Sequence, residues 1–343
     1  MTYPITVRSP SDLIAVLPFL LGYHPADSVA VVGLSGPDID FGACYEIPPP
    51  GSDPDRVREA ERVTAGTLAR QESAWLVVVG FGPAVRATPA VLGLVTALDA
   101  AGVRVKDALR VTEGRWWSYF CADLRCCSPD GTPCLPPDSV IAAEATFRGQ
   151  VALPSRRDLT ALVAPIGGPE RVAMGEATER ARKRFAELIA GAAADEGDGR
   201  RHARRIRRAG QIAVRQAETR YRSGRELDAD ETAWLGALLA DRAVEDYALD
   251  RVTPEDWRIR LWTDVLRRVE RVYVPTPACL LGFTAWRSGN GPLARVAVDR
   301  ALAAEPRHHL AGLLHEVLGF GLSPYLLNPD VPPSRARRFR RAR

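Results

Sequence analysis

The sequence predicts a three-layer α/β domain with a mixed sheet, followed by an all-α helical domain. In the first half, continuous apolar runs of strand length, such as 29–34 and 75–80, alternate with helical segments. After about residue 138 these runs give way to segments with helical start and stop signals. A chain of 343 residues is also long for a single core. We therefore expect an α/β domain over residues 1–150, a helical domain over 151–327 and an arginine-rich, disordered tail over 328–343.

Local signals order the elements of the first domain. A Ser-Pro-Ser-Asp sequence opens a helix at residue 9, and Gly22 ends it. The first two strands and the last two form hairpins, while the middle strands are joined by parallel crossovers, so the order is β-β-α-β-α-β-β. The expected elements are strands at 29–34 and 41–47, a helix at 53–70, a strand at 75–80, a helix at 88–100, and strands at 103–111 and 116–120.

The second domain reads as a series of helices. Asp228 before an apolar run and Thr253-Pro254 are typical helix starts. The small, acidic stretch at 192–199 predicts a flexible connection between two helices. The expected helices cover residues 139–147, 170–190, 199–221, 228–247, 254–272, 278–287, 292–304 and 309–319.

Residues 277–306 fit the pattern of a tetratricopeptide helical hairpin. A single hairpin cannot form a groove, since stacked repeats are needed. We therefore expect one tetratricopeptide-like hairpin that packs on the preceding helices and serves interaction rather than chemistry. The matching positions are the closing Pro306, the Leu281-Gly282 pair, and the small, large apolar and small residues Ala294, Val298 and Ala301.

Composition and charge narrow the class of protein. With 46% apolar and 26% charged residues, the chain is near the globular average. No apolar run approaches the roughly 20 residues that a membrane span needs. The apolar stretch at 14–21 has no basic segment before it, unlike a signal peptide. Six arginines in the last nine residues account for the net charge of +4, so the body is not basic. We expect a cytoplasmic protein with reduced thiols.

Four cysteines, Cys121, Cys126, Cys127 and Cys134, lie within fourteen residues after a predicted strand. Thiolates are good zinc ligands, and a loop can wrap around a tetrahedral ion. The spacing C-x4-C-C-x6-C differs from the paired C-x2-C knuckle, however, and adjacent cysteines rarely bind one ion together. Zinc is therefore one candidate cofactor, and the alternatives are buried, inert thiols or a disulfide.

Two loops flank the predicted strands where an α/β sheet often binds its ligands. His24, Asp27 and Ser28 have the residue types of a catalytic relay, but known relays converge from distant positions, and a turn stabilised by Asp27 or Ser28 is the simpler interpretation. Gly80 and Gly82 precede a helix, where glycines can admit a phosphate group. A strand-to-helix turn also explains them, since the full nucleotide-binding motifs are absent.

Residues 180–225 contain fourteen Arg or Lys and only five Asp or Glu. One helical face there could bind a phosphate backbone, because it carries Arg201, Arg204, Arg205 and Arg208. The following segment, 226–256, is strongly acidic, so pairing between neighbouring helices also explains the basic run. The arginine tail is a second candidate for weak association with nucleic acid.

Four stretches, at 9–34, 110–121, 126–133 and 280–306, together resemble an actinobacterial family known as a domain of unknown function (number four-one-nine-two). The resemblance covers most of the chain. It implies an actinobacterial, cytoplasmic protein without a specified activity, and its hallmarks are the LGYHPADS loop and the Trp-Trp/Cys segment. Cys134 departs from the pattern of that family.

No catalytic signature matches as sharply as the helical hairpin, so the sequence favours an interaction or regulatory protein over an enzyme. A protein partner or a second copy of the chain would bind through the helical domain. The alternative is an enzyme or nucleotide-binding protein, which requires that residues 24–28, 80–82 and 121–134 meet in one cleft. Association with nucleic acid through the arginine-rich segments is a third hypothesis.

Overall fold

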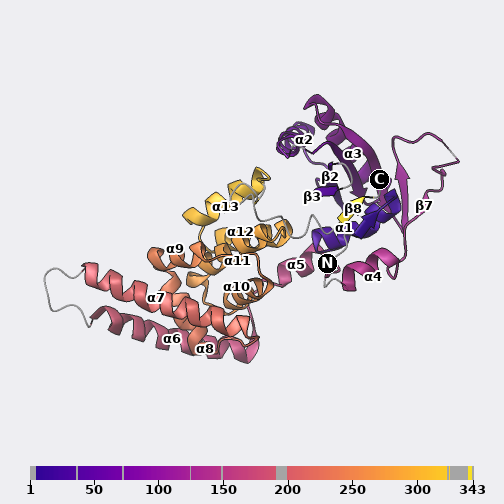
Figure 1. The fold of residues 1–343 in the computed structure, drawn as a ribbon. Helices are drawn as coiled ribbons and strands as arrows, with labels where there is room; N and C mark the ends of the chain where they lie inside the picture. The colour runs from indigo at the N-terminus through magenta and orange to yellow at the C-terminus, as the bar shows by residue number, and fades with distance from the viewer. Residues whose placement is uncertain are drawn as a thin grey trace. The chain divides into compact units, whose positions relative to one another are not determined.

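The computed structural model describes residues 5–35, 38–71, 73–123, 125–147, 150–190, 199–322, 324 and 339–341. The chain divides into two compact units: Met1–Leu159 with Gly319–Arg343, and Thr160–Leu318. The predicted fold class is confirmed, because a mixed sheet with helices is followed by a mostly helical region (Figure 1). The contacts place the boundary at Leu159, whereas the sequence placed it at residue 150.

The strands of the first unit form one mixed sheet. Its described strands are β1 (Ile5–Val7), β2 (Ser28–Ser35), β3 (Asp38–Glu46), β4 (Trp75–Phe81), β5 (Val105–Thr112), β6 (Arg115–Ser118), β7 (Thr132–Pro133) and β8 (Phe339–Arg341). Their spatial order is β1-β8-β3-β2-β4-β5-β6-β7. Only β1–β8 and β4–β5 pair in parallel. The predicted β-β-α-β-α-β-β order is that of β2 to β6 with their two helices, and β1, β7 and β8 extend the sheet at its edges.

β8 lies within the tail for which the sequence predicts disorder. It pairs in parallel with β1, whose open edge supplies backbone hydrogen-bond partners. The rest of the predicted tail lies outside the described residues, and so does nearly all of the connection predicted at 192–199.

Helices cover both faces of this sheet. β4 is buried almost throughout, and its alternate residues Leu76 and Val78 pack in a core with α2 (Pro54–Ala69) and α3 (Ala84–Ala100). The opposite face carries α1 (Pro10–Leu21), next to α4 (Val140–Phe147). A strand buried on both faces reads as a continuous apolar run, which is why the sequence revealed it.

The starts of α1 and α3 show how well local sequence signals predict helix boundaries. The hydroxyl of Ser9 accepts a hydrogen bond from the backbone N–H of Asp12, and Gly22 ends α1 with a φ of 82°, as predicted. α3, in contrast, begins at Ala84 rather than at residue 88. The helix accommodates Pro89 internally.

The second unit is a set of packed helices. After α5 (Arg156–Ala161), which spans the boundary, it contains α6 (Gly168–Ala190), α7 (Gly199–Arg222), α8 (Ala229–Leu239), α9 (Arg242–Asp250), α10 (Asp256–Arg268), the short 3-10 helix η1 (Arg271–Tyr273), α11 (Pro275–Arg287), α12 (Gly291–Ala304) and α13 (His309–Gly319). The single helix predicted at 228–247 is wrong. It is divided into α8 and α9, because the Asp241 carboxylate accepts a hydrogen bond from the N–H of Ala243 and starts a new helix.

α11 and α12 form the hairpin that the sequence predicts at its C-terminal end. They approach closely at Gly282, where a Cβ would lie 2.8 Å from Cγ2 of Val298. Nearly all of α11 is buried, so it is a core helix of the unit. Its membership in the tetratricopeptide class stays a prediction.

Candidate functional site

Three of the four candidate metal-ligating cysteines lie together after the end of β6. The sulfur atoms of Cys121, Cys126 and Cys127 all lie within 4.8 Å of one another. Cys126 is exposed, while Cys121 and Cys127 are partly buried. A tetrahedral zinc ion with Zn–S bonds of about 2.3 Å holds its sulfur atoms about 3.8 Å apart. These three residues, the cysteine cluster, could therefore hold a metal ion after small movements.

Asp123 organises the loop that brings these sulfur atoms together. Its carbonyl oxygen accepts hydrogen bonds from the backbone N–H groups of Cys126, at 3.0 Å, and Cys127, at 2.7 Å. Its carboxylate accepts a further bond from the N–H of Arg125 at 2.9 Å. The turn is thus closed by backbone geometry, without requiring a bound ion.

Ser118 anchors the beginning of this loop to the sheet. Its hydroxyl donates to Oδ1 of Asp107 at 2.7 Å and accepts from the N–H of Cys121 at 3.2 Å. Asp107 is the third residue of β5, so the cysteine cluster is fixed near the amino end of that strand.

The pKa values of Cys121 and Cys127 are shifted in opposite directions. A hydrogen bond from the Cys127 thiol and one from the backbone N–H of Asp123 lower the pKa of Cys121. Burial raises the pKa of Cys127 to about 12, and its hydrogen bonds to the neighbouring sulfurs add to this. Of these two thiols, Cys121 is therefore the first to ionise, and its thiolate is the form that binds a metal ion.

Cys134 lies apart from the other three. Its backbone N–H donates to the carbonyl of Gly114 at 2.8 Å, in the turn between β5 and β6. That turn is at the opposite end of β6 from Cys121. Burial raises the pKa of the Cys134 thiol. The structure thus brings together three of the four cysteines that the sequence singled out.

His24, Asp27 and Ser28 are not arranged as a relay. No hydrogen bond between described residues joins their side chains. Ser28 is the first residue of β2 and is only 4% exposed. His24 is exposed, and its backbone N–H donates to the carbonyl of Leu153. Asp27 has a φ of 44°, and its Oδ1 lies 3.1 Å from Nε of Arg86 at the start of α3. The loop is a turn tied to its neighbours.

Local packing and backbone geometry explain why glycine occupies positions 80 and 82, the candidate phosphate-binding residues. A Cβ on Gly80 would lie 2.5 Å from Cγ2 of Val91, so α3 packs directly on this part of β4. Gly82 has a φ of 139°, which favours glycine, and a Cβ there would lie 3.2 Å from Oδ1 of Asp27. The loop with Asp27 and the turn with Gly82 are therefore neighbours.

The cleft that the enzyme hypothesis required is not formed. Ser28 pairs with Phe81, so the first two segments meet at the carboxyl end of β4. Ser118 pairs with Leu109, and the chain continues from there toward the amino end of β5. At about 3.3 Å per residue, roughly 13 Å of strand separates the cysteine cluster from the other two segments.

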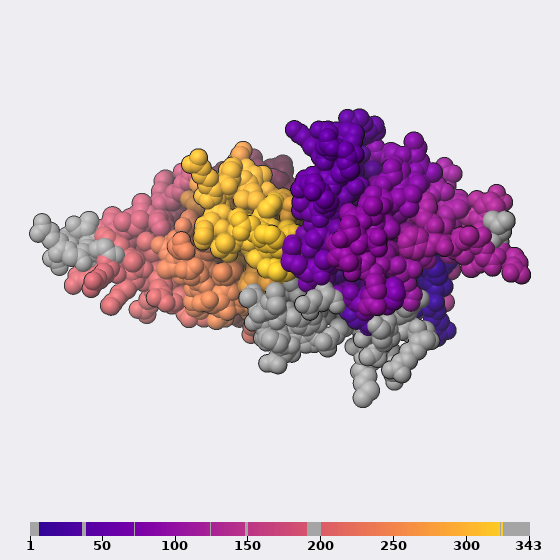
Figure 2. All heavy atoms as spheres, turned by 90° about the horizontal axis from the view of Figure 1, so that it is seen from above, coloured from indigo at the N-terminus to yellow at the C-terminus, as the bar shows by residue number. Residues whose placement is uncertain are grey.

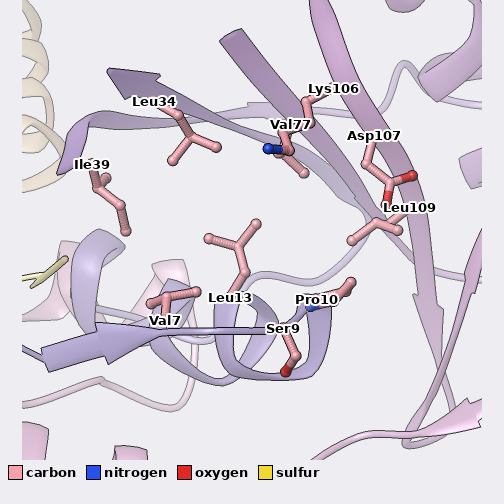
Figure 3. A pocket seen from close by; sticks show the side chains of 10 residues that line it. All are labelled: Val7, Ser9, Pro10, Leu13, Leu34, Ile39, Val77, Lys106, Asp107 and Leu109. Carbon is pink, nitrogen blue, oxygen red and sulfur yellow. The ribbon is translucent and has the colours of Figure 1, made fainter. Parts of the chain in front are cut away.

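A small pocket lies in the first unit between α1 and the sheet (Figure 3). Its volume is about 110 Å³, and its lining is mostly apolar, with Leu13, Val77 and Leu109 pointing into it. Lys106 and Asp107 stand at one side, but Asp107 already accepts hydrogen bonds from Ser118 and from its neighbour's N–H. The pocket therefore offers apolar surface rather than a free carboxylate for chemistry.

The second unit contains a Cys–His–Glu chain that the sequence did not predict. Sγ of Cys279 lies 3.7 Å from Nδ1 of His308, and Nε2 of His308 lies 3.6 Å from Oε1 of Glu245. The residues come from distant segments, so no spacing announced them. Cys279 is fully buried, and burial raises the pKa of its thiol. A protonated, inaccessible thiol is a poor nucleophile, so this chain is a structural network.

The arginine-rich segment forms the exposed side of α7. The opposite side is buried through Ala213, Val214, Ala217 and Tyr221. Among the described contacts, no ion pair or side-chain hydrogen bond involves four exposed arginines of the first turns, which we call the arginine face: Arg204, Arg205, Arg207 and Arg208.

Other basic residues of the same segment are paired. Arg180 contacts Asp230 at 2.8 Å, and Arg220 forms an ion pair with Glu231. The acidic segment therefore neutralises part of the basic run, as one of the two interpretations predicted, but none of its described contacts reaches the arginine face. The side chains of the arginine tail lie outside the described residues.

Within the described part of the chain, no helix combines the length and the apolar character needed to cross a bilayer.

Comparison with known proteins identifies a family but no individual relative. No curated protein and no solved structure is significantly similar to the chain. One family model, described as Domain of unknown function (DUF4192), matches residues 10–325 and so spans strands β2 to β7, the cysteine cluster and the helical unit. The family resemblance seen in the sequence is confirmed, and the chain belongs to the Domain of unknown function (DUF4192) family.

Proposed function

We propose that the protein is a cytoplasmic interaction protein whose helical unit binds an anionic macromolecule through the arginine face. The observation that carries this proposal is the set of four exposed guanidinium groups without a described partner. The predicted hairpin contributes less, because α11 is buried inside its unit.

The arginine face does not serve the stability of α7. Its members lie three or four residues apart, as Arg204 does from Arg207 and Arg208, so their charges repel across one turn. Such like-charged pairs cost a helix about 0.2–0.5 kcal/mol each. A bound anion would relieve the repulsion. Binding therefore accounts for these charges, whereas the stability of the fold does not.

Heparin chromatography of the full-length chain tests the proposal. The triple variant R204Q/R205Q/R208Q should elute at a lower salt concentration than the unmodified protein, because three contacts to the anionic matrix are lost. Co-elution of the two proteins would refute the proposal.

A matched control is available on α2. The variant R56Q/R58Q/R62Q removes the same charge from three exposed arginines that pair with acidic neighbours on their own helix. It should elute close to the unmodified protein. If both triple variants elute equally early, only net charge matters, and the arginine face has no special role.

A second function is supported by the cysteine cluster, which we propose binds zinc. Three sulfur atoms within 4.8 Å fit thiolate ligation, and the hydrogen bonds that lower the pKa of Cys121 favour its thiolate form. The fourth coordination position would be left to water or another ligand. Zinc bound here would stiffen the loop between β6 and β7.

Metal analysis of the purified chain tests the zinc proposal. We expect about one zinc per chain by native mass spectrometry, and a thiolate-to-cobalt absorption band after exchange with Co²⁺. C121S and C127S should lose both signals, whereas C134S should keep them, because Cys134 lies at the other end of β6. Absence of both signals in the unmodified protein would refute zinc binding.

A further inference from the structure

We infer that the anionic partner of the arginine face is the phosphate backbone of double-stranded DNA, bound with little dependence on sequence. This inference rests on the proposed function and names the class of macromolecule for the same surface. It is argued from the shape of the arginine face, from the residues around it and from its position on α7.

The arginine face has the dimensions of a groove-binding helix. At 3.6 residues per turn, its four side chains spread over an arc of about 160°, with Arg205 and Arg207 at the two edges. Arg204 and Arg208 lie between them. A helix with its side chains is about 10–12 Å across, and the major groove of DNA is about 12 Å wide. Arginines on opposite edges of such a helix can therefore reach both phosphate strands.

The surrounding residues argue against a membrane. Basic helices that bind lipid surfaces insert large apolar side chains beside their charges. The exposed positions from Arg200 to Arg208 are arginines and Ala203, and the described exposed large apolar side chains nearby are only Ile212, one turn further along α7, and Ile189 of α6. A row of guanidinium groups along a helix is complementary to the regular charge of a duplex, which carries one phosphate per about 1.7 Å of its axis.

The start of α7 is accessible within its own unit. Most described packing partners of α7 engage its later turns, through residues such as Gly210, Glu218 and Tyr221. In the first turns, α6 approaches through the carbonyl of Ile189, which lies 2.8 Å from Nε2 of His202, a residue outside the arginine face. Figure 2 shows the salmon-coloured first turns of α7 at the surface. A duplex approaching this end would meet the arginine face before α8, α9 or α10.

Fluorescence anisotropy with the full-length chain and a labelled 20-base-pair duplex tests the inference. The unmodified protein should bind, and its affinity should fall steeply as salt rises from about 50 to 200 mM. R204Q/R205Q/R208Q should bind at least about tenfold more weakly at the lower salt, and its salt dependence should be shallower by up to about three units of slope. R56Q/R58Q/R62Q should bind like the unmodified protein, and two unrelated duplexes should differ by less than about threefold.

Parallel measurements separate this inference from the proposed function. Polyglutamate and vesicles rich in phosphatidylserine are tested against the same variants. If either binds through the arginine face while the duplex does not, the DNA inference is overturned and the proposed function stands. Equal binding of the duplex by both triple variants also overturns the inference. Loss of the heparin difference would instead remove the proposed function.

Discussion

The two ends of α7 use charge in opposite ways. In the last turns, Glu218 is 3% exposed and accepts hydrogen bonds from Arg251 and Arg258, so its charge is neutralised inside the unit. In the first turns, the arginine face is exposed and has no described partner. One helix therefore contributes an internal ionic network at one end and a free cationic surface at the other. The number of arginines in a segment does not show whether they form an internal ionic network or an exposed cationic surface.

The difference has a physical origin in packing. The later turns of α7 pack against α8, α9 and α10, and any charge there must be paired to offset its desolvation. The polar group of Tyr221 is paired for the same reason. Its hydroxyl donates a hydrogen bond to Asp264, which also forms an ion pair with Arg268. The first turns are not enclosed, so their charges remain hydrated and can be exchanged for contacts with a partner.

The largest expected effect is that of Glu218→Gln. Removing this carboxylate leaves Arg258, which is 4% exposed, without its buried counter-charge. Breaking a buried pair from one side costs about 3–5 kcal/mol. Hydrogen–deuterium exchange of α7 amides in the intact chain should report this as a much lower opening free energy. Unchanged amide exchange rates in this variant would contradict the difference between the two ends of α7.

Tyr221→Phe should cost less, about 1.5 kcal/mol, because it removes one hydrogen bond to a carboxylate and keeps the ring. The same exchange experiment measures it. Arg208→Gln serves as the matched control, since it changes an exposed residue of the same helix. An equal effect of the two substitutions would show that the later turns are not held by this contact.

Alkaline pH provides a second test of the contact between Tyr221 and Asp264. Burial, followed by the hydrogen bond to Asp264, raises the pKa of Tyr221 above its ordinary value near 10. The unfolded chain therefore loses this proton first, and the stabilisation is complete below about pH 10 and declines above it, by up to about 1.4 kcal/mol per pH unit. Urea unfolding followed by circular dichroism should show a steeper decline in the unmodified protein than in Tyr221→Phe. Parallel declines would contradict this assignment.

The smallest effect on stability is expected for R204Q/R205Q/R208Q. Relief of the three like-charged pairs 204/207, 204/208 and 205/208 should raise the free energy of unfolding only modestly, by about 1 kcal/mol. Urea unfolding measures this value. A loss above about 1 kcal/mol would mean that these arginines do contribute to the fold, and the contrast between the two ends of α7 would disappear.

Local signals in the sequence were sufficient for most of the fold. Ser9 and Gly22 bound α1 as expected, and the apolar run at the core of β4 announced a strand buried on both faces. The division at Asp241 was missed because an aspartate within a helical pattern is also typical of an exposed helical position. The edge strands were missed because each is only two or three residues long and is defined by its neighbour.

The candidate sites were less predictable. Clustering in the sequence suggested four cysteines, yet the turn at Asp123 joins three of them and the β6–β7 pairing carries Cys134 away. The network of Cys279, His308 and Glu245 left no trace in the sequence, since its members are distant along the chain.

The sequence by itself determined most of the strands and helices, because hydrophobic period, caps and turn residues act over a few neighbouring positions. It also determined where arginines are concentrated. Only the tertiary structure decided which of those arginines are neutralised, because that depends on which acidic side chains the packing brings within about 4 Å. For the same reason it alone decided which thiols meet: a sulfur atom's partners are set by the path of the backbone through space, and not by its distance along the chain.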